Sequence, residues 1–140
     1  MSSIIERSDS LNTRVRRERE ALAMAEEAVT MLDGIFDRFP ASRDGSGRPA
    51  KSFRVPRFTT TDGVLIQLDR TNYNRSDKGV YNVSIVDENN VFHGYAQLWR
   101  GTERINYWDP RNHGSRIAGS TEQDSELLGI LRIADETVVN

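Results

Sequence analysis

The sequence predicts an α+β fold in which one long N-terminal helix packs on an antiparallel sheet of four to five strands. The apolar residues from Ser3 to Phe39 follow the spacing of a helix. From Ser52 to Trp108 they change to the alternating pattern of strands, and two pairs of turn residues interrupt that pattern at hairpin spacing. The length of 140 residues is close to the commonest size of a single domain.

We therefore divide the chain into three parts of one folding domain. The long helix occupies 1–39, a linker with the turn-forming run ASRDGSGRPA occupies 40–51, and the sheet with its C-terminal tail occupies 52–140. The tail stays ambiguous, because its stretch SELLGILRI fits a short helix begun by Ser120 or Thr121, whereas the last residues ETVVN fit an edge strand.

The N-terminal helix carries a stripe of positions that alternate at spacings of four and three. Only Ser8 and Glu18 are polar in a stripe formed by Ile4, Ser8, Leu11, Val15, Glu18, Leu22, Ala25, Val29, Leu32, Phe36 and Phe39. Ser3 and Glu6 have the spacing of a capping box at the helix start, and Pro40 marks the end.

Geometry predicts that the first half of this helix extends beyond the sheet. A helix of this length measures roughly 54 Å, whereas four or five strands are only ~20 Å across. Too few apolar residues lie in the overhang to stabilise it alone, so we expect homo-oligomerisation there, in the manner of a coiled coil, through Ile4, Leu11, Val15 and Leu22. The alternative is that the first dozen residues fray or form a separate short helix.

Two tight turns set the expected strand register. Asn89-Asn90 fits a two-residue hairpin turn with positive φ at both positions, which pairs Ser84 with Tyr95 and Asn82 with Gln97. Gly101-Thr102 fits a second turn, which pairs Ala96 with Tyr107, Gln97 with Asn106 and Tyr95 with Trp108. Both registers sort the shared strand onto the same two faces, which is the strongest evidence for the sheet.

The two expected faces differ in chemistry. The core face consists of Tyr81, Val83, Ile85, Phe92, Ala96, Leu98, Ile105 and Tyr107. The opposite face is polar and aromatic, with Asn82, Ser84, His93, Tyr95, Gln97, Trp99, Arg104, Asn106 and Trp108. A strand over 63–69 extends the sheet, and 52–58 adds another whose Pro56 restricts it to an edge. We expect the helix from Ala21 to Phe39 to cover the core face.

Composition excludes several classes of site. Without cysteine there is neither a disulfide, a thiolate metal site nor a cysteine nucleophile. His93 and His113 lack the spacing of metal ligands, so we expect no metal and no cofactor. A net charge of −2 disfavours binding to long nucleic acids, although Arg43, Arg48, Lys51, Arg54 and Arg57 form a basic strip. No apolar run is long enough to cross a membrane, so we expect a cytoplasmic protein.

One segment contains the residue types of a hydrolytic triad. Asp109, His113 and Ser115 lie close together in WDPRNHGS, but such clustering beside proline and glycine is typical of a turn. We assign no catalytic residue and expect a protein that is not an enzyme, with an enzyme of unidentified class as a remaining alternative.

The polar aromatic face is the predicted binding site. Tryptophan and tyrosine rings stack on planar groups, arginine binds anions, and amides bind polar edges. We expect a non-catalytic, homo-oligomeric protein that binds a small planar anionic ligand, nucleotide-like in character, through Tyr95, Trp99, Arg104, Asn106, Trp108, Asn82 and Gln97. A second hypothesis is a protein-binding adaptor, chaperone or inhibitor that acts through the helix or the sheet.

Overall fold

The computed structural model describes residues 4–38, 52–72, 79–99, 104–109 and 115–137, and at 4–10, 52–54, 72, 109 and 115–118 we describe the backbone alone. The elements in chain order are α1 (Ile4–Asp37), β1 (Ser52–Arg54), β2 (Phe58–Thr59), β3 (Leu65–Asn72), β4 (Gly79–Val86), β5 (Phe92–Trp99), β6 (Asn106–Asp109), β7 (Ser115–Ala118) and α2 (Thr121–Thr137). The predicted α+β class with an antiparallel sheet is confirmed.

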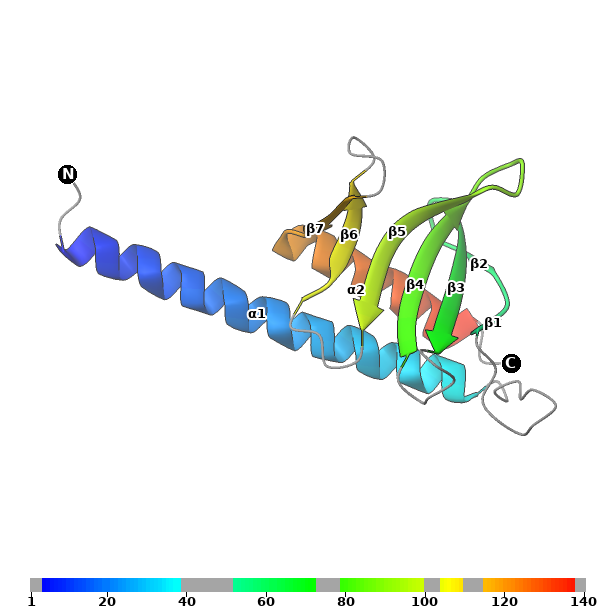
Figure 1. Cartoon of the computed structure of the whole chain (residues 1–140), viewed down its shortest axis with the longest axis horizontal. Coiled ribbons are helices and arrows are strands. Elements are labelled where there is room, and N and C mark those ends of the chain that lie inside the picture. Colours follow the sequence, from blue (N-terminus) through cyan, green and yellow to red (C-terminus); the bar gives the residue numbers. More distant parts are fainter. Residues whose placement is uncertain (1–3, 39–51, 73–78, 100–103, 110–114, 138–140) are drawn as a thin grey trace.

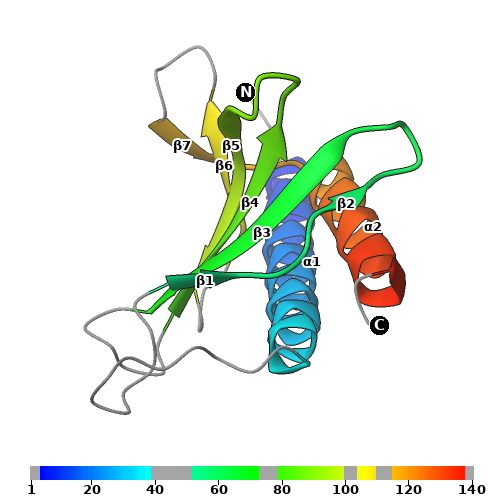
Figure 2. The ribbon, with the colours of Figure 1, turned by 90° about the vertical axis from the view of Figure 1, so that its right-hand side faces the viewer.

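The molecule has two layers, with both helices on one face of a strongly curved sheet (Figure 2). The strand order is β1-β3-β4-β5-β6-β7, and all described pairs are antiparallel. β1 and β2 both pair with β3 and form one broken edge, interrupted at Val55, Pro56 and Arg57. The edge position expected from Pro56 is therefore correct, because proline has no amide hydrogen for a further strand.

α1 extends far beyond the sheet. Its 34 residues span about 51 Å, and every residue from 11 to 20 is exposed. Figure 1 shows this N-terminal part projecting away from the other elements, and we call residues 4–20 the arm. The predicted overhang is confirmed as a helix that continues to Ile4, whereas self-association through it remains a prediction.

α2 resolves the ambiguity of the tail in favour of a helix. The amide of Gln123 donates to the Ser120 hydroxyl at 3.2 Å, and the amide of Ser120 donates to the Gln123 side-chain oxygen at 3.0 Å. This reciprocal pair is a capping box, which satisfies amides that have no partner inside the helix. Ser120 is therefore the N-cap, and the helix extends through Glu136 and Thr137, where an edge strand was the alternative.

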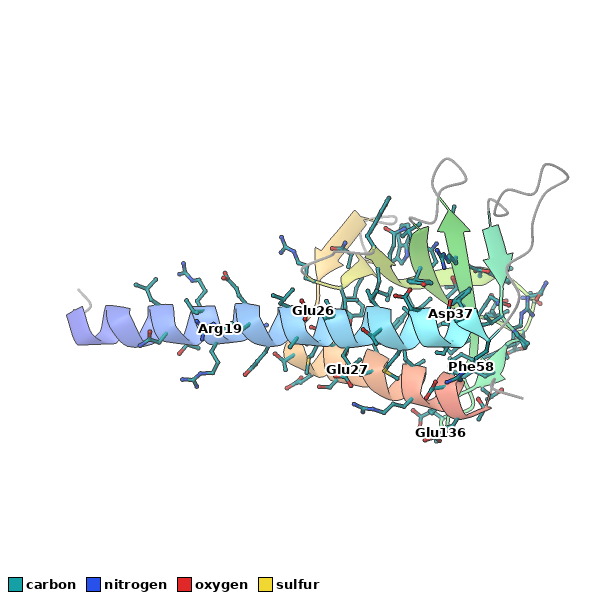
Figure 3. The ribbon with its side chains drawn as sticks, turned by 90° about the horizontal axis from the view of Figure 1, so that it is seen from below. Arg19, Glu26, Glu27, Asp37, Phe58 and Glu136 are labelled. Atoms are coloured by element: carbon teal, nitrogen blue, oxygen red, sulfur yellow. The ribbon has the colours of Figure 1, made fainter. Side chains whose placement is uncertain are left out.

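α1 and α2 run side by side in the same direction (Figures 1 and 3). Their C-terminal ends are joined by Arg38, whose guanidinium donates to the backbone oxygen of Asp135 at 2.9 Å and to its carboxylate at 2.5 Å. Nearer the middle of α2, Arg132 forms a 3.3 Å ion pair with Glu27.

The hydrophobic core lies between the sheet and both helices. α1 contributes five buried residues, as expected for the helix that covers the core face, and α2, which was not expected there, contributes four more. The helical part of the core consists of Ala25, Ala28, Leu32, Ile35 and Phe36 from α1 and Leu127, Leu128, Leu131 and Ala134 from α2. The strands contribute mainly Ile66, Leu68, Tyr81, Val83, Ala96, Leu98 and Tyr107.

The β4–β5 hairpin departs from the expected register at two points. The loop contains three residues instead of two, because the amide of Asp87 donates to the oxygen of Val91 at 3.0 Å, and only Asn90 has a positive φ, of 64°. This loop type ends in a left-handed residue. The two-residue turn predicted at Asn89-Asn90 is therefore wrong in type, although its position is correct.

A β-bulge then compensates for the extra loop residue. Val83 pairs with Ala96, but Ser84 pairs with Gly94, so Tyr95 has no partner on β4. The pairing of β4 with β5 is as predicted from Val80 to Val83. From Ser84 to Val86, nearer the loop, each β4 residue pairs with the β5 residue one position before the predicted one. The predicted pairing of Ser84 with Tyr95 is wrong, because a bulge places two residues opposite one.

The bulge exchanges the faces of two aromatic residues. Tyr95 packs against the core, with its ring centre 5.7 Å from that of Tyr107. It therefore lies on the same side as Leu98, which contradicts its assignment to the polar face. Phe92, expected in the core, instead lies beneath the guanidinium of Arg57 at 5.1 Å. Beyond the bulge the predicted pairs of Ala96 with Tyr107 and Gln97 with Asn106 are confirmed, and the turn at Gly101-Thr102 lies outside the described residues.

Candidate functional site

The face of the sheet opposite the helices, which we call the outer face, retains part of the predicted site. Trp99 Nε1 lies 3.3 Å from the side-chain oxygen of Gln97, to which it donates, and Gln97 donates to Asn82 at 3.0 Å. Gln97 is buried, whereas Asn82 and Trp99 are half-buried. These polar groups therefore bond to one another, which reduces what they offer to a ligand.

Trp108 covers a glycine on the same strand as Trp99. A Cβ at Gly94 would lie 2.4 Å from Trp108 Nε1, so the indole rests directly on the backbone of β5. The predicted pairing of Trp108 with Tyr95 is not formed, because the β5–β6 ladder consists of the pairs of Ala96 with Tyr107 and Gln97 with Asn106. Gly94 is thus the contact that the bulge brings under the ring.

The two other residues of the predicted binding site, Asn106 and Arg104, lie in different places. Asn106 is half-buried and pairs with Gln97. Arg104 is exposed and borders a groove beside the arm, together with Arg14 and Arg17. The structure therefore brings together Asn82, Gln97, Trp99, Asn106 and Trp108 on neighbouring strands, removes Tyr95 to the core side, and gives Arg104 a place in the groove.

The basic strip contributes one described arginine to the outer face. Arg57 donates to Gln67 at 3.0 Å and to Asn90 at 2.7 Å while it covers the Phe92 ring. Gln67 is buried and donates in turn to the backbone oxygen of Val55 at 2.9 Å. Arg43, Arg48 and Lys51 lie outside the described residues, and of Arg54 only the backbone is described.

The segment that resembles a triad forms part of a hairpin. Asp109 and Ser115 are paired on β6 and β7, a strand the sequence did not predict. His113 lies outside the described residues, so the triad itself is not tested. His93 is exposed, and its Nε2 lies 2.9 Å from a carboxylate oxygen of Asp87. This contact, with the amides of Val91 and Asn89, holds the pKa of Asp87 below its usual value.

A cleft of about 290 Å³ lies between α2 and the sheet, from the β2–β3 turn to β5. Its aliphatic lining comes from both layers and consists of Val64, Ile66, Ile85, Ile130 and Ile133. Its polar lining consists of Thr60, Thr61, Asp62, Tyr95 and Glu126. An apolar cavity with a few polar groups is the usual form of a small-molecule site, and this volume is at the lower end of the range.

Two local features of the backbone form this cleft. The bulge in β5 turns the Tyr95 ring toward α2, and Gly129 leaves one position of α2 without a side chain. A Cβ added at Gly129 would meet no atom within 4 Å, so the absent side chain leaves space and avoids no clash. The cleft could not be predicted from the sequence because the bulge places Tyr95 on the opposite face of the sheet from the one expected. Gly129, between Leu128 and Ile130, was the one feature of the sequence that could have indicated it.

Electrostatics make the cleft favourable to positive charge. Burial, together with the carboxylates of Glu126 and Asp124, which oppose a phenolate, raises the pKa of Tyr95 to about 12. The Tyr95 hydroxyl is therefore neutral at physiological pH. Asp62, at the β2–β3 turn, adds another carboxylate to the lining. Ionised carboxylates and neutral hydroxyls attract cations and accept hydrogen bonds.

Among the described residues, no helix is long and apolar enough to span a membrane, and no three histidine or acidic side chains are grouped as metal ligands. The sequence matches no protein-family model, and no curated protein or solved structure resembles the chain significantly.

Proposed function

We propose that this protein is a non-catalytic binding protein that captures a small organic amine in the cleft beneath α2. The main support for this proposal is the aliphatic cleft of about 290 Å³, whose polar lining includes the carboxyl groups of Asp62 and Glu126. The apolar part of the ligand would contact Ile66, Ile85 and Ile133, and its ammonium group would lie toward the two acidic residues.

The small size and the positive charge of the proposed ligand follow from two separate features of the cleft. The volume admits a short alkyl chain or one ring, and burial of each CH₂ contributes about 0.8 kcal/mol. An ammonium group near the surface gains ~1 kcal/mol or more from a carboxylate at contact distance. The raised pKa of Tyr95 also supports a positively charged ligand, because nearby negative charge is one of the causes of that rise.

Calorimetry with hexylammonium and hexanoate tests this proposal, because the two probes share a chain and differ in charge. We expect hexylammonium to bind and hexanoate to bind roughly tenfold more weakly or not at all. Equal binding of both, or of neither, would contradict an acidic cleft that selects amines.

Two glycines provide a matched pair of variants. Gly129→Met projects a side chain into the cleft, so we expect it to abolish binding of hexylammonium. Gly34→Met makes the same replacement in α1, where an added Cβ likewise meets no atom within 4 Å and no side chain lines the cleft. Binding should persist in that control, and its loss there would assign the effect to altered folding.

The planar anionic ligand expected from the sequence is a second candidate, on the outer face. The two half-buried tryptophans, Trp99 and Trp108, support it, and Arg57 adds a positive charge. Adenosine monophosphate is a suitable probe, with tryptophan fluorescence as the signal. Quenching that disappears in Trp108→Ala but persists in Gly129→Met would favour the outer face over the cleft.

A further inference from the structure

The stripe on α1 is used along only half of its length. Within the body its residues Ala25, Leu32 and Phe36 are buried in the core. In the arm and where it meets the body the same stripe is exposed, with 55% of Leu11, 44% of Val15 and 38% of Leu22 accessible. A stripe that packs in one half of a helix and is bare in the other half indicates a missing partner.

The spacing of the exposed stripe is symmetric about Thr13. Reversing the helix about that position superposes 4 on 22, 8 on 18 and 11 on 15. Two antiparallel copies would therefore place apolar positions opposite apolar ones, Leu11 opposite Val15 and Ile4 opposite Leu22. The two polar positions, Ser8 and Glu18, would also fall opposite each other. Polar pairs of this kind specify the register of helical interfaces.

The structure provides a groove for the second arm. It has a volume of about 700 Å³ and follows α1 from Arg14 to Leu22, with a second wall formed by Arg104, Ile105 and Gly119. In the antiparallel register, positions 4–12 of a second copy lie opposite 14–22, which is the length of this groove. The first residue of the incoming α1, Ile4, would lie opposite Leu22, where α1 enters the body.

Charge favours the same direction. Positions 4–12 contain two carboxylates, Glu6 and Asp9, and one arginine. Positions 14–22 contain four arginines and two glutamates, and across the groove Arg104 adds a fifth arginine while Asp124 adds one carboxyl group, so the groove stays predominantly basic. Antiparallel pairing therefore sets the acidic half of one arm against the basic half of the other, whereas parallel pairing sets like halves together.

We infer that two copies of this chain form a dimer with twofold symmetry, in which each arm lies antiparallel in the other's groove. The interface is isologous, since the same surface serves both copies. It contains four apolar layers and two polar ones, and contact with the exposed Arg104 extends it beyond the arm. This inference is independent of the proposed ligand site, because the cleft beneath α2 and the groove share no residue.

Sedimentation of the full chain tests the dimer. We expect a dimer for the natural sequence and a monomer for Leu11→Glu, with unchanged helix content because Leu11 is exposed. Thr13→Glu is the matched control, since position 13 lies on the side of the helix away from the stripe, and it should remain dimeric. A monomeric natural protein, or a dimer that survives Leu11→Glu, would overturn the inference.

Spin labels determine the direction of the arms. The chain has no cysteine, so Ala23→Cys, at an exposed position, can be labelled specifically. Antiparallel arms centred on residue 13 place the two labelled positions about 30 Å apart along the helix axis. Parallel arms would place them at the interaxial distance of about 10 Å. The short distance would reject the antiparallel arrangement even if the protein is a dimer.

Discussion

The Tyr107 hydroxyl donates a hydrogen bond to a carboxylate oxygen of Asp124 at 2.8 Å, at a point where both side chains are buried. This bond joins β6 to the first turn of α2. Burial raises the pKa of Asp124, while the Tyr107 hydroxyl and the charge of Arg17 oppose that rise. The hydroxyl therefore stabilises the ionised carboxylate inside the protein.

We predict that Tyr107→Phe lowers the free energy of unfolding by about 2–3 kcal/mol at neutral pH, because it removes a hydrogen bond to a buried charge. The loss should shrink in mild acid. Without the hydroxyl the pKa of Asp124 rises further, and stability associated with a raised carboxyl pKa is lost as the pH increases through it. Urea denaturation at the two pH values measures both effects.

Asp124→Asn is the control for this bond, since an amide oxygen still accepts from Tyr107 and has no charge to bury. We expect it to change stability by less than about 1 kcal/mol and to show no acid dependence of its own. If Tyr107→Phe costs as much in acid as at neutral pH, Asp124 is not the titrating partner.

From the raised pKa of Tyr95 we predict that the protein becomes less stable in alkali. Its pKa is raised from 10 to about 12, so the folded protein keeps the phenol protonated over a range in which the unfolded chain releases the proton. The stabilisation is complete below pH 10 and is lost as the pH rises toward 12. Phenolate absorbance should show delayed ionisation in the folded state, and Tyr95→Phe should reduce the alkaline slope of the unfolding free energy. An unchanged slope in that variant would place the ring in water.

Gly94 and Gly34 should respond oppositely to alanine. A Cβ at Gly94 would lie 2.4 Å from Trp108 Nε1, so Gly94→Ala must displace the indole or bend β5. We expect a loss of about 1–3 kcal/mol, as for other overpacked sites, with altered tryptophan fluorescence. At Gly34 the same Cβ meets no atom within 4 Å, and alanine in a helix should stabilise by up to about 1 kcal/mol. Urea midpoints and emission spectra of both variants measure this contrast.

Much of the architecture was predictable because it depends on periodicity. The helical stripe of α1, the overhang of the arm, the broken edge at Pro56 and the paired order of β3, β4, β5 and β6 all follow from patterns in the sequence. α2 was uncertain because the stretch SELLGILRI fits a short helix, whereas the last residues ETVVN fit an edge strand. The hydrogen bonds of Ser120 and Gln123, which identify its start, depend on a spacing that the sequence does contain.

The candidate site was less predictable because it depends on single-residue irregularities. A two-residue turn and a regular strand give the same pairing for Val83 and Ala96 as a three-residue turn followed by a bulge. The alternation of apolar and polar residues beyond the bulge therefore could not distinguish these possibilities. Only the residues between the turn and the bulge differ, and among them lie Phe92 and Tyr95. Their exchange moves Tyr95 from the expected polar face into the lining of the cleft.

This compensation predicts that the chain tolerates deletion of Tyr95. Without it Gly94 and Ala96 become neighbours, and their present partners Ser84 and Val83 are already adjacent on β4, so the ladder becomes regular with no residue changing face. We expect a folded protein that is less stable by about 1–3 kcal/mol, from the loss of a half-buried aromatic side chain, with Trp108 still resting on Gly94. Deletion of the paired residue Gln97 is the control, because it reverses the faces of one part of the strand and should prevent folding. Circular dichroism and urea denaturation of the two deletions, with nuclear Overhauser contacts between Trp108 and Gly94, measure the difference. Equal disruption by both deletions would mean that Tyr95 is needed for the fold itself and is not an inserted residue.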